Sequence, residues 1–175
     1  MNNESADILR MLNRGFGDLA TDAFDLCPED LREAIDALNA EVYPALNNGV
    51  YRAGFATTQA AYEDAFADVF AMLDRLDSRL AASGPFLFGD RVTEADIRPF
   101  VTAIRFDAAY HGLFKCNLRR LIDYRALTAH TGRMLDLHGV RATVSIDHIK
   151  RGYHSIRSLN THGIVPLGPA LPWDL

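Results

Sequence analysis

The sequence predicts an all-α protein, a helical bundle with a buried central helix. Apolar residues recur at helical spacing along several segments, and the strand-like alternation of apolar and polar residues is almost absent. The segment after Thr93 is nearly apolar on all sides, as a helix at the centre of a bundle would be. With 175 residues, 49% of them hydrophobic, the chain can bury one sizeable core.

The N-terminal part is predicted to form two helices. The first is short, from Ser5 to Asn13, and Gly15 breaks it. The second begins at Pro28, because a proline suits a first helical turn, and continues with apolar residues at helical spacing to about Leu46. A kink is expected at Pro44. The Asn47-Asn48-Gly49 segment either ends this helix or distorts it.

Two helices with clear signals follow. An amphipathic helix with one apolar stripe spans Tyr62 to Leu80 and ends at Ser83-Gly84-Pro85. Thr93 and Asp96 then form the pattern of a capping box, which starts the central helix. Loss of this cap should cost about 1 kcal/mol. Pro99 inside the central helix should bend it.

The C-terminal third is predicted to contain shorter helices. They cover Asn117 to Leu127, about Ala129 to Leu137, and Asp147 to Arg157. The tail from Thr161 to Leu175 is rich in proline and glycine and should be irregular.

Composition excludes several classes of function. The net charge of -5 and the pI of about 5.6 argue against a nucleic-acid partner, which needs clustered lysine and arginine. No stretch approaches the roughly 20 apolar residues of a membrane span, and the first residues have no signal-peptide pattern. We therefore expect no membrane partner and a cytoplasmic location. The two cysteines, in no paired motif, should stay unbridged.

Few residues suggest chemistry by themselves. The six histidines are scattered, so no metal site is expected. Cys27 precedes the predicted helix start, where the helix dipole would lower the pKa of a thiol, but Glu29 and Asp30 oppose this effect. An ordinary residue at a helix cap is the favoured interpretation of Cys27, and a redox thiol is the alternative. Cys116, in an apolar context, is predicted to lie in the core.

Two aromatic segments are candidates for ligand binding. Tyr51 lies among small residues, where a ligand could approach the backbone closely, although a packing role is equally open. Tyr153 precedes His154 just before the irregular tail. Charged residues of the central helix, Arg98, Arg105 and Asp107, are expected to be structural, because buried charges need partners.

These segments together resemble the glutathionyl-hydroquinone reductases, the Xi class of the glutathione transferases, over essentially the whole chain. The resemblance is carried by Asn2-Asn3-Glu4-Ser5, Gly49-Val50-Tyr51-Arg52-Ala53-Gly54-Phe55-Ala56-Thr57-Thr58-Gln59, Thr93-Glu94-Ala95-Asp96-Ile97-Arg98, Ile104-Arg105-Phe106-Asp107, Phe114-Lys115-Cys116-Asn117 and Gly163-Ile164-Val165-Pro166. It implies the helical C-terminal bundle of a glutathione transferase for residues 25–175. It also implies that residues 1–24 are the end of a thioredoxin-like domain and a linker.

The family's chemistry depends on a cysteine in a Cys-Pro-Trp-Ala motif of the thioredoxin-like domain. Its thiolate attacks the sulfur of a glutathionyl-hydroquinone, releases the hydroquinone and is regenerated by a second glutathione. That motif is not in this sequence, since Cys27-Pro28 is not followed by Trp-Ala. We therefore expect no catalytic residue in the chain, and weak or absent activity for the chain by itself.

The resemblance also implies binding residues. Glu4 and Ser5 match the segment that holds the γ-glutamyl end of glutathione, the co-substrate, at a helix start. Tyr51 and Tyr153 match tyrosines that face an aromatic quinol, where a phenol can hydrogen-bond the substrate oxygen. A homodimer is the expected assembly. The alternative function is a non-enzymatic helical module that binds an aromatic ligand or a protein partner.

Overall fold

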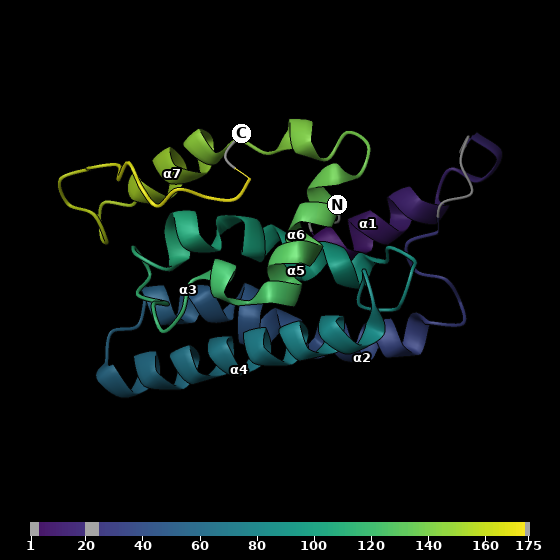
Figure 1. Ribbon diagram of the computed structural model, residues 1–175, viewed down its shortest axis with the longest axis horizontal. Helices are drawn as coiled ribbons and strands as arrows, with labels where there is room; N and C mark the ends of the chain where they lie inside the picture. The colour runs from purple at the N-terminus through teal and green to yellow at the C-terminus, as the bar shows by residue number, and fades with distance from the viewer. Residues whose placement is uncertain (1–3, 20–24, 174–175) are drawn as a thin grey trace.

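The computed structural model describes residues 4–19 and 25–173, and in these ranges every regular element is helical (Figure 1). The α-helices are α1 (Ser5–Arg14), α2 (Arg32–Val42), α3 (Gly49–Gly54), α4 (Gln59–Ser83), α5 (Glu94–Arg105), α6 (Arg125–Asp136) and α7 (Ile146–His154). Two π-helical turns, η2 (Tyr43–Asn47) and η3 (Phe106–Tyr110), follow α2 and α5 directly, and η1 (Gly17–Leu19), η4 (Leu121–Asp123) and η5 (Arg141–Thr143) are short 3-10 turns. The predicted all-α class is confirmed.

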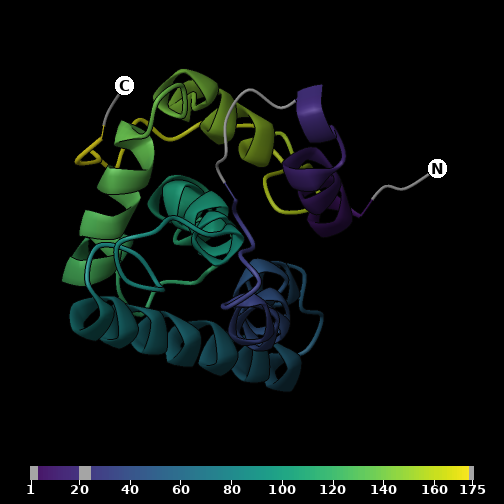
Figure 2. The same cartoon turned by 90° about the vertical axis from the view of Figure 1, so that its right-hand side faces the viewer.

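Helix α5 is the central helix of the bundle. Figure 2 shows it surrounded by the other helices, with α4 along one side and α7 on the opposite side. Most of its side chains are buried, including Phe100 and Ile104. The predicted buried central helix is therefore confirmed, and Val101 is the large apolar residue of α5 that stays exposed.

The predicted amphipathic helix is also confirmed and is longer than its apolar stripe. Thr58 caps α4 by accepting a hydrogen bond from the Ala61 N–H at 3.2 Å, and the helix ends at Gly84, whose φ of 109° disfavours other residues. The buried face is the predicted one and includes Val69, Phe70, Leu73, Leu76 and Leu80. Burial of this face fixes α4 against α3 and α6.

The capping box of α5 is present and is part of a larger buried network. Asp96 accepts from the backbone N–H of Thr93 at 2.9 Å, as predicted, and from the Thr93 hydroxyl at 3.0 Å. Its other oxygen accepts from the Leu87 N–H at 2.8 Å and lies 3.0 Å from Nε2 of His130 on α6. Asp96 and His130 are both fully buried. This carboxylate therefore links α5 to α6 as well as starting α5.

The prediction for the second helix was wrong at its start, and at its far end the distortion, one of the two alternatives left open, is what the structure shows. Residues 28–31 form a turn, in which the Leu31 N–H donates to the Pro28 carbonyl at 3.1 Å, and α2 begins only at Arg32. Asn47-Asn48-Gly49 does not end the helical path, because η2 continues into α3. The distortion is the π turn, in which the Asn48 N–H donates to the Tyr43 carbonyl at 2.8 Å. Pro44 lies inside it and cannot donate a helical hydrogen bond.

The prediction of a helix over residues 117–127 was also wrong. Side-chain carboxylates take the backbone donors there: Asp107 accepts from the Leu121 N–H at 2.6 Å, and Asp123 accepts from the Arg120 N–H at 2.8 Å. Only η4 remains of that helix, and one continuous helix, α6, replaces the two predicted ones. The predicted tail is irregular over residues 161–173, and its last two residues lie outside the described ranges. Helix α7 ends at His154, three residues before the predicted end at Arg157.

Within the described ranges, no helix is both long and apolar enough to span a bilayer. No group of three His, Cys, Asp or Glu side chains is placed to hold a metal ion in that part of the chain. Cys27 and Cys116 are free thiols and both are buried.

Candidate functional site

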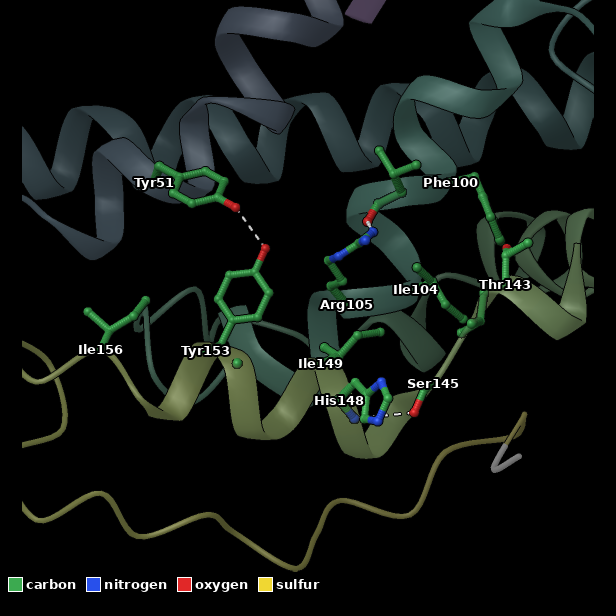
Figure 3. Close-up of a pocket in the computed structure, with 13 residues that line it drawn as sticks. Tyr51, Phe100, Ile104, Arg105, Thr143, Ser145, His148, Ile149, Tyr153 and Ile156 are labelled. Atoms are coloured by element: carbon green, nitrogen blue, oxygen red, sulfur yellow. Dashed lines mark hydrogen bonds between the residues drawn. The ribbon is translucent and has the colours of Figure 1, made fainter.

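Three tyrosines from separate elements meet at their hydroxyl groups. The Tyr153 hydroxyl oxygen, on α7, lies 2.7 Å from that of Tyr51 on α3 and 2.6 Å from that of Tyr110 on η3. Figure 3 shows the Tyr51 and Tyr153 hydroxyls pointing toward each other. The sequence prediction that paired these two residues in one site is thus consistent with their placement, and the structure adds Tyr110.

The ring of Phe114 packs against all three tyrosines of the cluster. Its ring centroid lies 5.4 Å from that of Tyr51, 5.3 Å from that of Tyr110 and 5.8 Å from that of Tyr153, all within aromatic contact distance. Phe114 is fully buried against Gly54 of α3, where a Cβ atom would lie 2.5 Å from the phenylalanine ring. Glycine at position 54 is therefore required for this close approach of α3 to the ring.

The π turn η3 carries Tyr110 into the cluster. Its hydrogen bond runs from the His111 N–H to the Phe106 carbonyl at 2.8 Å, which inserts an extra residue into the end of α5. Tyr110 is 2% exposed, so its hydroxyl depends on Tyr153 for a partner. This is the side chain of the cluster that sequence reasoning missed, and no motif around it marked it as a site residue.

Burial raises the pKa of two of these phenols above the ordinary value of 10.0, so both are protonated at neutral pH and well above it. It raises the pKa of Tyr110 well above its ordinary value, and the hydrogen bond to Tyr153 adds to the rise. Burial also raises the pKa of Tyr153 to about 12. The hydrogen bond with Tyr110 and the positive charge of Arg105 lower this pKa, but burial outweighs them. Protonated phenols can donate a hydrogen bond to an oxygen of a bound ligand.

Two cavities meet at the cluster. The first, here called the α1 cavity, has a volume of about 510 Å³ and lies among α1, α5 and the tyrosines, with Ser5 on its wall. The second, the α7 cavity, has a volume of about 560 Å³ and lies between α5 and α7. Tyr51, Val101, Arg105 and Tyr153 line both cavities. A ligand in either cavity can therefore reach the tyrosine hydroxyls.

Ser5 reaches the site because α1 is fastened to the bundle by polar contacts. The guanidinium of Arg10 donates to the Glu94 carboxylate, with Nε 3.0 Å from Oε2, and Asn39 donates to the same carboxylate at 3.0 Å. Glu94 is 1% exposed, whereas the Arg10 side chain is 38% exposed, so the pairing is partly buried. Glu4 is the N-cap residue of α1, next to the α1 cavity but not among its lining residues.

Two of the three charged residues Arg98, Arg105 and Asp107, on α5 and η3, differ from the expectation of purely structural roles. Asp107 fits it, because this buried carboxylate lies 3.3 Å from Nε of Arg120. Arg98 and Arg105 do not: Arg98 lines the α1 cavity and Arg105 lines both cavities. The sequence alone did not distinguish the roles of the three residues, because all of them lie on the continuous helical path of α5 and η3.

Neither cysteine belongs to the site. Cys27 and Cys116 line neither cavity and are 3% and 0% exposed. Cys27 does not lie at a helix start, because the residues after it form a turn and α2 begins only at Arg32. Burial raises the pKa of the Cys116 thiol to about 12, consistent with the predicted core role.

Comparison with known proteins gives one consistent result. Residues 59–133 match the family model described as glutathione S-transferase, C-terminal domain. The chain is 51% identical to the glutathionyl-hydroquinone reductase PcpF of Sphingobium chlorophenolicum, over 98% of this chain and 55% of that protein. It is 42% identical to the glutathionyl-hydroquinone reductase YqjG of Escherichia coli (strain K12), over 97% of this chain and 52% of that protein.

Solved structures agree with the sequence relatives. The glutathione-bound structure of YqjG from Escherichia coli K-12 superposes with a TM-score of 0.95 at 42% identity, covering 99% of this chain and 56% of that one. Glutathione transferase Xi 1 from Trametes versicolor superposes with a TM-score of 0.93 at 45% identity, covering 99% and 61%. The chain spans about half the length of the curated relatives it matches. The chain carries the helical C-terminal domain of the glutathione transferases, and over nearly its whole length it is similar to the glutathionyl-hydroquinone reductases.

Proposed function

We propose that this chain is the quinol-binding part of a glutathionyl-hydroquinone reductase, which transfers glutathione from a glutathionylated quinol to a thiol. The observation that carries the proposal is the meeting of the Tyr51, Tyr110 and Tyr153 hydroxyls where the two cavities join. A phenolic substrate oxygen placed there could replace one tyrosine in this chain of hydrogen bonds. Identity of 51% to a relative of that name supports the same reaction class.

The reaction implied by the resemblance needs a thiolate and an aromatic leaving group. The thiolate attacks the sulfur of the conjugate, the bond from sulfur to the ring carbon breaks, and the ring takes up a proton to leave as the hydroquinone. The resulting mixed disulfide is reduced by a second glutathione, which gives glutathione disulfide and restores the thiolate. In this scheme Tyr51 and Tyr153 hold the substrate oxygen and steady the charge that develops on the ring.

The thiolate in this proposal comes from outside the printed sequence. The only cysteines, Cys27 and Cys116, are buried and line neither cavity. We infer that it belongs to a thioredoxin-like domain of which residues 1–24 are the end and the linker. Glutathione would then lie along the α1 cavity, with its γ-glutamyl end at Glu4, Ser5 and the first N–H groups of α1.

Binding of 2-naphthol, a stable phenol, to the purified chain tests the role of the tyrosines. We expect calorimetric titration to show binding that weakens about fivefold in Tyr51→Phe and in Tyr153→Phe, because each loses one neutral hydrogen bond. Tyr62→Phe is the matched control, since the Tyr62 hydroxyl donates to the Lys115 carbonyl and lines neither cavity. Equal affinity in all four proteins would contradict the proposal.

Turnover tests the inferred source of the thiolate. The purified chain mixed with glutathionyl-menadiol and glutathione should release no menadiol. Measurable release would place a competent nucleophile within this sequence and overturn that part of the proposal. The second candidate function, a non-enzymatic module, is favoured by the exposure of Met11 and Leu12 on α1, 56% and 60%. It predicts that naphthol binding does not depend on the tyrosines.

A further inference from the structure

Arg105 is a cation without an acidic partner at the junction of the two cavities. Its guanidinium donates to the Val101 carbonyl within the same helix, and among the described residues no carboxylate oxygen lies within 4.0 Å of it. Other arginines that contact the core differ: Arg10 pairs with Glu94 and Arg120 pairs with Asp107. The half-buried charge of Arg105 is therefore available to a ligand.

The α7 cavity combines this charge with an apolar wall. Phe100, Ile104, Ile149 and Ile156 contribute aromatic and aliphatic surface, and neither aspartate nor glutamate is among the lining residues. Its volume of about 560 Å³ is in the ordinary range for a small-molecule pocket. Figure 3 shows Arg105 beside the Tyr51 and Tyr153 pair, on the side toward Ile104. The cavity thus offers phenols at one position, a guanidinium beside them and apolar surface beyond.

We propose that the α7 cavity binds quinols that carry a carboxylate on the aromatic ring system, and that Arg105 pairs with that carboxylate. This inference rests on the proposed function, since it places the quinol oxygen at the tyrosine hydroxyls. The ring system packs on the apolar wall. Guanidinium and carboxylate form charge-assisted hydrogen bonds, which are stronger than neutral ones and strengthen further where water is partly excluded.

A single acidic group is the ligand charge that fits this site. One guanidinium neutralises one carboxylate, and the two planar groups can form a bidentate pair of hydrogen bonds. His148 and Ser145 also line the cavity, and the Ser145 hydroxyl accepts a hydrogen bond from the backbone N–H of His148 at 3.3 Å as the cap of α7.

Two naphthols that differ in one group test the inference. Calorimetric titration of the purified chain at neutral pH should show 6-hydroxy-2-naphthoate binding about tenfold more tightly than 2-naphthol, as expected for one added charge-assisted contact. Arg105→Gln should abolish this preference while 2-naphthol still binds, which also reports that the cavity is folded. Arg105→Lys should keep part of the preference. Arg125→Gln is the matched control, because Arg125 is exposed and lines neither cavity.

The outcomes distinguish a failure of this inference from a failure of the proposed function. If both naphthols bind equally, or if Arg105→Gln keeps the tenfold preference, the pairing of Arg105 with a carboxylate is overturned. Tyrosine-dependent binding of 2-naphthol would then leave the proposed function standing. If neither naphthol binds, the quinol pocket itself is absent and both proposals fail. Loss of the preference in Arg125→Gln as well would assign it to the overall charge of the chain and overturn the inference.

Discussion

The Tyr153 and Tyr110 hydroxyl oxygens lie 2.6 Å apart, although the two residues are 43 positions apart in the sequence. The contact joins α7 to the π turn at the end of the central helix, so the candidate site forms only when these two elements are packed. Burial of the pair raises the pKa of both phenols. The state of these phenols should therefore report on native packing.

Stability should fall at alkaline pH, in part because of Tyr153. Its pKa rises from 10.0 to about 12 on folding, so the native state holds the phenolic proton more tightly than the unfolded chain. The resulting stabilisation is fully present below pH 10.0 and is lost as the pH rises through about 12. Urea unfolding across this window should show a smaller loss in Tyr153→Phe than in the wild type. An identical pH dependence in the two proteins would rule out this contribution.

Gly54→Ala should destabilise the protein by about 1–3 kcal/mol. The new Cβ would lie 2.5 Å from the Phe114 ring, which is fully buried and cannot move away freely. Gly112→Ala is the control, since nothing lies within 4 Å of a Cβ built there. Chemical denaturation of both variants measures the difference. A stability loss at Gly54 no larger than at Gly112 would show that Phe114 shifts without cost.

Asp96→Ala should cost about 3–5 kcal/mol, well above the value of about 1 kcal/mol expected for a helix cap alone. The carboxylate serves the Thr93 and Leu87 N–H groups and His130, all within the core, and its removal leaves buried donors unsatisfied. Asp123→Ala removes an exposed cap that serves only the Arg120 N–H and should cost about 1 kcal/mol or less. Equal losses in urea unfolding would contradict the buried-network explanation.

Neither thiol should react in the native protein. Cys27 and Cys116 are 3% and 0% exposed, so an aromatic disulfide reagent such as DTNB should modify both only after unfolding. Naphthol binding should be unchanged in Cys27→Ser, because that residue lines neither cavity. Rapid modification of one thiol under native conditions would reopen the redox interpretation of Cys27.

Local sequence signals determined a large part of the fold. The apolar stripe of α4, the capping box of α5 and the nearly apolar surroundings of Phe100 each depend on residues within a few positions of one another. The irregular tail follows from its proline and glycine content in the same way. Family motifs then pointed to Tyr51 and Tyr153. Helical spacing and capping can be predicted without the tertiary contacts, because both are properties of the local chain.

Tertiary structure decided what local patterns could not. Asp107 takes the Leu121 N–H and so prevents a helix over residues 117–127, a competition that sequence spacing does not reveal. The π turn that brings Tyr110 to Tyr153 depends on packing between α7 and the end of α5. Arg105 and Asp107 are two positions apart, yet one lines the cavities and the other is paired and buried. The sequence by itself determined the strongly patterned helices and the family resemblance; packing of distant segments decided the site, because its hydroxyls and cavities exist only between elements.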